Sequence, residues 1–262
     1  MQVKSLIHAN FITRILFKEF IISMTVLSII QAFFLSLMLP SIAISLRPYS
    51  YHIHFSPSPK LLAPVISITS YIYGIIAVIA AAQIASEIER GDAALYLSFP
   101  ISRLSYIFSW IIAALVLPSV MYFLSLSIPL LIIEPKLLFG IGGEELLLIV
   151  LQVSTSAIIS FLAAIILKRR AFALAVGMFE YIILPFIFTF IIALLSSYLS
   201  YTGQSFTSSS IWWFAILYPY NYYLFFDYLG VKWFEAACVN IPFLLFILAF
   251  LIIYTKRYFE AG

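Results

Sequence analysis

Long apolar runs separated by short polar stretches dominate the hydropathy pattern of this chain. Because about 20 residues at a rise of about 1.5 Å cross a hydrocarbon core of roughly 30 Å, each run of about 18 or more apolar residues predicts a transmembrane helix. Six runs qualify, at about 20–44, 64–85, 104–133, 146–167, 172–199 and 236–254. The third run contains Pro118 and Pro129, so we expect it to kink or tilt.

The composition agrees with a membrane protein. Hydrophobic residues make up 64% of the chain and charged residues 10%, whereas a soluble domain carries about 25% charged residues. Too few polar side chains remain to cover a soluble core, so we expect an all-α polytopic membrane protein with a single domain, 1–262. The amphipathic stretch 1–19 predicts a helix in the membrane interface. The aromatic-rich segment 211–234 predicts an external re-entrant or interfacial segment, with a plain aromatic belt as the alternative.

The distribution of positive charge predicts the orientation of the spans. Of the 14 Lys and Arg residues, ten fall on one side of the predicted spans. They are Lys4, Arg14, Lys18, Arg90, Arg103, Lys168, Arg169, Arg170, Lys256 and Arg257. Because cytoplasmic loops are enriched in Lys and Arg, we expect both termini to be cytoplasmic in a multi-pass protein of the cell membrane.

Several polar side chains fall inside the predicted spans. Glu180 lies within the fifth span, where a carboxylate is costly and marks a functional hypothesis. Gln152, Ser156 and Ser160 recur every four residues, which places them on one face of the fourth helix. Lining of a translocation path and plain helix packing both explain these residues. Ser70 and Gly74 in the second span predict a further packing face of small residues.

Motifs for catalysis are absent from the sequence. It contains no G-x-x-x-x-G-K-[ST] phosphate loop, no G-x-S-x-G elbow and no H-E-x-x-H zinc motif. His52 and His54 have no third ligand within reach, so we expect no metal site. We therefore expect a protein that is not an enzyme and that binds no cofactor itself.

A charged segment, EIERGDAALYLSFPISR, runs from Glu87 to Arg103 between the second and third spans. Gly91 and Pro100 bracket a short predicted helix, 92–97, with Asp92 at its positive N-terminal end. This segment resembles the cytoplasmic loop between the second and third spans of ABC-2-type permeases of ATP-binding-cassette transporters. The resemblance is carried by Glu87, Glu89, Gly91, Leu95, Ser98, Pro100, Ile101, Ser102 and Arg103.

The resemblance implies that the segment is a coupling helix that docks in a separate ATPase subunit, which would bind ATP and magnesium. The docking residues implied are Glu87, Glu89, Arg90, Gly91, Asp92, Leu95, Pro100, Ser102 and Arg103. It further implies a lipid-embedded exporter that acts as a homodimer or paired permease, with no nucleic-acid partner. The alternative hypothesis is a stand-alone ion- or proton-coupled carrier or channel that uses Glu180.

Overall fold

The computed structural model describes residues 63–98, 102–133, 143–202 and 233–258, together with Ile22, residues 25–27 and 29–31, and Phe33. Five helical segments in this part of the chain are long and apolar enough to cross a membrane. They are Thr69–Arg90, Arg103–Ile132, Leu146–Leu167, Arg170–Leu199 and Ala237–Arg257. The described part of the chain is thus all-α, with the helix lengths and composition of a multi-pass membrane protein. The second to sixth predicted spans each correspond to one of these helices.

Three sequence predictions fall outside this description. The interfacial helix predicted at 1–19 lies outside the described residues, as does most of the first predicted span. The aromatic segment predicted at 211–234 also lies outside them, except for its last two residues, which begin the final helix. These three remain predictions.

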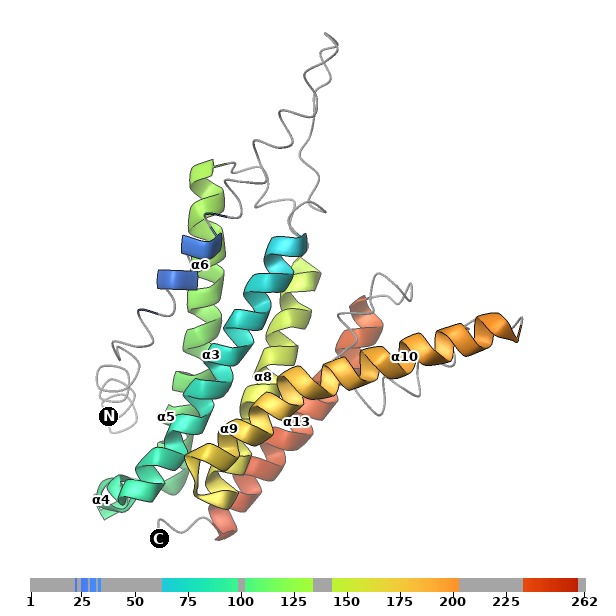
Figure 1. The fold of residues 1–262 in the computed structure, drawn as a ribbon. Helices are drawn as coiled ribbons and strands as arrows, with labels where there is room; N and C mark the ends of the chain where they lie inside the picture. Colours follow the sequence, from blue (N-terminus) through green and yellow to red (C-terminus); the bar gives the residue numbers. More distant parts are fainter. Residues whose placement is uncertain are drawn as a thin grey trace.

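The helices form an elongated bundle (Figure 1). In chain order they are α3 (Ala63–Arg90), α4 (Asp92–Ser98), α5 (Arg103–Ile111), α6 (Leu117–Ile133), α8 (Gly143–Leu167), α9 (Arg170–Met178), α10 (Leu184–Tyr201) and α13 (Trp233–Tyr258). A π-helical segment, η3 (Ile112–Val116), joins α5 to α6, and another, η4 (Phe179–Ile183), joins α9 to α10. The two long spans are therefore continuous but irregular helices.

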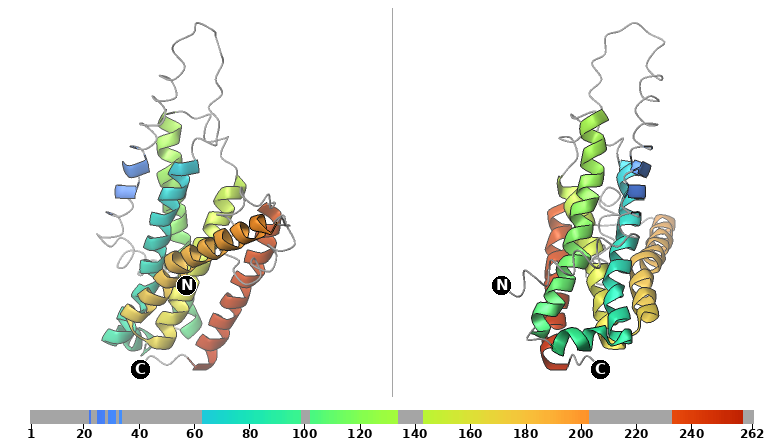
Figure 2. Two further views of the ribbon diagram at one scale, coloured as in Figure 1. Left: turned by 45° about the vertical axis from the view of Figure 1, so that its right-hand side comes forward. Right: turned by 90° about the vertical axis from the view of Figure 1, so that its left-hand side faces the viewer.

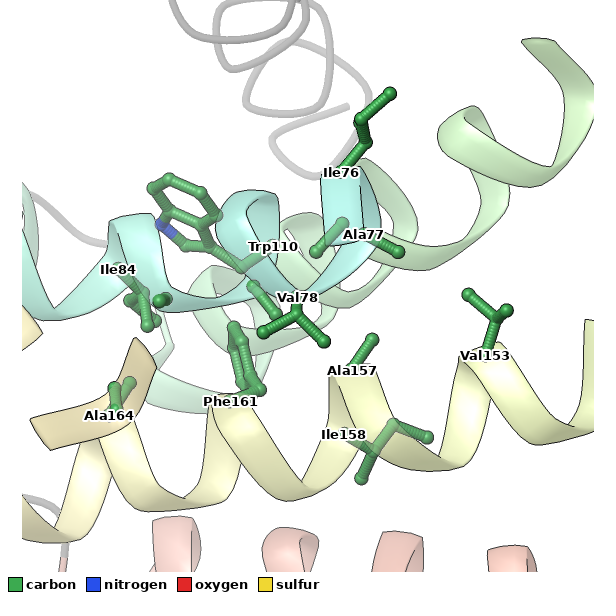
Figure 3. Close-up of a cluster of buried hydrophobic side chains, with 14 of the residues drawn as sticks. Ile76, Ala77, Val78, Ile84, Trp110, Val153, Ala157, Ile158, Phe161 and Ala164 are labelled. Atoms are coloured by element: carbon green, nitrogen blue, oxygen red, sulfur yellow. The ribbon is translucent and has the colours of Figure 1, made fainter. Parts of the chain in front are cut away.

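The pair α3 and α8 forms the centre of the bundle. Figure 3 shows Ala77 and Val78 of α3 facing Ala157 and Phe161 of α8, all of them buried. Small residues on both helices let the two backbones approach closely, which is how helices pack inside a bilayer. By contrast, α10 diverges from this pair and exposes most of its apolar side chains, such as Phe186.

Both π-helical segments end two residues before a proline. Segment η3 ends at Val116 before Pro118, and η4 ends at Ile183 before Pro185. Proline has no N–H group and its ring clashes with the carbonyl four residues earlier, so the wider π turn accommodates it. The distortion predicted at Pro118 corresponds to η3, which ends two residues before it, whereas Pro129 lies within α6 with no π-helical segment directly before it.

Positive charge gathers at one end of the bundle. This end holds α4, the start of α5, the α8–α9 connection and the end of α13 (Figures 1 and 2). Every Lys and Arg in the described ranges lies there, namely Arg90, Arg103, Lys168, Arg169, Arg170, Lys256 and Arg257. This clustering agrees with the grouping that the sequence predicted, while the side of the membrane stays a prediction.

Candidate functional site

The short helix predicted in the charged segment is present as α4, Asp92–Ser98. It begins after Gly91, whose φ of +79° is unfavourable for other residues. Gly91 N–H donates to the carbonyl of Ile88 (3.1 Å), and the Gly91 carbonyl accepts from Ala94 N–H (3.1 Å). A Cβ on Gly91 would meet no atom within 4 Å, so the backbone conformation and not the available space favours glycine here.

Helix α4 lies across the end of the bundle, between α3 and α5 (Figure 2, right). Its inner side buries Ala93 and stacks Tyr96 on Tyr106 of α5, with ring centroids 6.4 Å apart. Leu95 is 61% exposed. The helix thus offers an apolar side chain on its outer surface, at the end of the molecule where the described cations gather.

The acids that precede α4 contact other helices of the same chain. Glu87 is buried, and its Oε2 accepts a hydrogen bond of 2.6 Å from the Tyr106 hydroxyl of α5. Glu89 is exposed, but its Oε1 accepts the backbone N–H of Arg170 at 3.1 Å. Because that N–H belongs to the first residue of α9, Glu89 caps α9 from another helix. These two acids therefore tie α3 to α5 and to α9.

The remaining residues of the predicted docking set have local roles in the structure. Arg90 Nη2 donates to Ser86 Oγ at 3.4 Å. Ser102 caps α5, since its Oγ accepts the backbone N–H of Ser105 at 3.0 Å. Arg103 is exposed at the start of α5, while Pro100 lies outside the described residues.

The polar residues predicted inside the spans come together in the bundle interior. Gln152, Ser156, Ser160 and Glu180 are all buried. Ser160 Oγ lies 3.1 Å from the carbonyl of Ala173 and 3.4 Å from that of Val78, linking α8 to α9 and α3. Ser156 Oγ donates to the carbonyl of Gln152 at 3.2 Å and also interacts with Glu180. In this conformation the cluster joins helices inside the chain.

Segment η4 places Glu180 and its neighbour Tyr181 in the interior. The Tyr181 ring lies over Gly74 of α3, and its hydroxyl donates to the carbonyl of Ser70 at 2.8 Å. The predicted packing face of small residues on α3 is therefore confirmed. On the preceding turn, Gly177 approaches Ser160 so closely that an added Cβ would lie 2.7 Å from the serine Cβ.

Sequence reasoning did not identify Tyr106 or Tyr181 as partners of the polar residues. Pro185 was an available signal for the irregular segment around Tyr181, but nothing local marked Tyr106. No group of three or more His, Cys, Asp or Glu residues that could hold a metal ion occurs among the described residues.

Comparison with family models, with curated proteins and with solved structures finds no match to this chain.

Proposed function

We propose that this chain is the membrane-spanning permease subunit of an ABC-2-type ATP-binding-cassette transporter. It would couple ATP hydrolysis by a separate ATPase subunit to movement of a substrate, in the outward direction that most of this family serves. The observation that carries the proposal is helix α4, which lies across the bundle end between two spans and exposes Leu95. Support comes also from the loop sequence around α4, which resembles the coupling loop of that family.

The contacts around α4 supply a route by which motion could reach the spans. A partner that displaces α4 would act on α5 through the stacked rings of Tyr96 and Tyr106. It would act on α3 directly, because only Gly91 separates α3 from α4. The hydrogen bond from Tyr106 to Glu87 and the cap of Glu89 on α9 would keep α3, α5 and α9 moving together. In this proposal Glu87 and Glu89 transmit motion, and the outer face of α4 docks.

The test uses co-expression with a candidate phosphate-loop ATPase subunit from the same genome. The pair should co-purify and show vanadate-sensitive ATP hydrolysis. Changing Leu95→Glu should abolish co-purification, because a carboxylate buried at the interface without a partner costs about 3–5 kcal/mol. That cost corresponds to a loss of affinity of more than about a hundredfold.

Tyr201→Glu is the control, since Tyr201 is an exposed side chain at the last residue of α10, beyond the apolar span Arg170–Leu199 and away from α4. This variant should keep the ATPase. If Leu95→Glu retains the ATPase as well as Tyr201→Glu does, α4 is not the docking helix. If the unmodified chain moves an ion or protons without any ATPase, the Glu180-based carrier replaces the proposal.

A further inference from the structure

A two-residue connection separates two of the spans. Helix α8 ends at Leu167 and α9 begins at Arg170, with Lys168 and Arg169 between them. The apolar spans themselves end at Leu167 and begin at Arg170. Three consecutive cations, Lys168–Arg170, therefore lie directly at the boundary of the hydrocarbon, at the depth of the lipid headgroups. We call this segment the basic turn.

The charges of the basic turn are not neutralised by the described part of the chain. None of the three side chains forms an ion pair with a described residue, and Arg169 is exposed. Glu89 touches the segment, but it accepts the backbone N–H of Arg170 and not its guanidinium. An anion at this point would supply the missing negative charge.

Apolar side chains border the basic turn on both helices. Ile166 and Leu167 at the end of α8 are 42% and 45% exposed, and Phe172 in the first turn of α9 is 53% exposed. A soluble anion would leave these apolar side chains uncovered, whereas a phospholipid presents a phosphate above an acyl chain that can contact them. Basic pockets between transmembrane helices on the cytoplasmic side are known to hold anionic headgroups.

We propose that the basic turn is a binding site for an anionic phospholipid, with the phosphate at Lys168–Arg170 and an acyl chain against Ile166, Leu167 and Phe172. The site is independent of the proposed transport function, because it needs neither an ATPase nor a substrate. It would hold the α8–α9 end of the bundle in the membrane plane, next to the helix end that Glu89 caps.

The test measures lipid retention by native mass spectrometry on the full chain, purified from mixed phosphatidylglycerol and phosphatidylcholine. The unmodified chain should retain phosphatidylglycerol in preference. The triple variant Lys168→Gln, Arg169→Gln, Arg170→Gln should lose that preference. Each cation near an anionic surface contributes about fivefold in affinity at low salt, so the three together should contribute on the order of a hundredfold.

The matched control is the triple variant Arg103→Gln, Lys256→Gln, Arg257→Gln, which removes the same charge from exposed positions at the same end. It should keep most of the preference. Equal losses in the two triple variants would overturn the proposal, because they would indicate a general attraction of the bundle end. Displacement of the lipid by millimolar inorganic phosphate would also overturn it, since the site would then recognise free phosphate.

A charge-preserving variant covers the case in which the glutamine variant does not fold. Lys168→Arg, Arg169→Lys, Arg170→Lys retains all three cations and should retain the preference for phosphatidylglycerol. If this folded variant binds both lipids equally while its thermal unfolding matches the unmodified chain, the proposal fails.

Discussion

Replacing Gly74 by alanine tests the contact between α3 and η4 that positions the intramembrane cluster. An ideal Cβ at Gly74 would overlap Cζ, Oη and Cε1 of Tyr181. The ring cannot easily move aside, because Tyr181 is 3% exposed and its hydroxyl is bonded to Ser70. The edge of the neighbouring Tyr71 ring also confines it, with ring centroids 6.2 Å apart.

The expected cost can be worked out from three contributions. Overpacking of a filled core costs about 1–3 kcal/mol, and loss of the Tyr181 hydrogen bond costs about 0.5–1.5 kcal/mol. Against these, alanine is about 1 kcal/mol better than glycine inside a helix. The overlap outweighs the helix preference, so Gly74→Ala should lower the free energy of unfolding by roughly 1–3 kcal/mol.

Thermal unfolding of the purified chain in detergent measures this effect. Gly143→Ala is the matched control, because a Cβ at Gly143 would meet no atom within 4 Å, and it should be neutral or slightly stabilising. Adding Tyr181→Ala to Gly74→Ala should cost less than the sum of the two single changes, since removing the ring makes room for the methyl group. Identical unfolding temperatures for Gly74→Ala and Gly143→Ala would refute the close approach of η4 to α3.

Two further changes test the polar contacts. Tyr106→Phe removes the 2.6 Å hydrogen bond to buried Glu87 and should destabilise the chain by about 1.5–3 kcal/mol. The control is Tyr198→Phe, at an exposed tyrosine, which should have no effect in the same unfolding assay. Equal stability of the two variants would contradict the hydrogen bond between Tyr106 and Glu87. Glu180→Gln keeps the shape and hydrogen-bonding capacity of the side chain beside Ser156 and should be tolerated. Glu180→Lys should instead cost about 2.5–3.5 kcal/mol in membrane insertion. Expression at equal levels of both Glu180 variants would show that the position is not buried in the membrane.

The features that sequence predicted correctly are those set by local chemistry. Apolar runs determined five spans, because a helix must be apolar over the thickness of the bilayer wherever it packs. Gly91 determined the break before α4, since the backbone there adopts a positive φ. The small residues Ser70 and Gly74 indicated a packing face, although they did not reveal what packs there.

The features that sequence could not predict depend on residues far apart in the chain. Glu89 and Arg170 are 81 residues apart, and Tyr181 and Ser70 are 111 apart. Hydropathy assigns each residue a depth in the membrane but does not identify its neighbours. The loop sequence therefore could not predict that Glu87 and Glu89 contact α5 and α9. The two π segments had a partial signal in Pro118 and Pro185, because a proline inside a span requires some adjustment of the helix but does not specify which.

The internal roles of these acids change what the bundle end presents to its surroundings. A count of the charged segment from Glu87 to Arg103 finds acids and bases in near balance. In the fold, however, Glu87 is buried against Tyr106, whereas Arg103 and Arg169 are exposed. Burial of this acid makes the outer surface of this end more basic than the sequence suggests. It follows that docking on α4 would depend on burial of Leu95, while the cations of the basic turn remain available for lipid headgroups. The two proposals thus use neighbouring surfaces that meet at Arg170, whose backbone N–H is capped by Glu89.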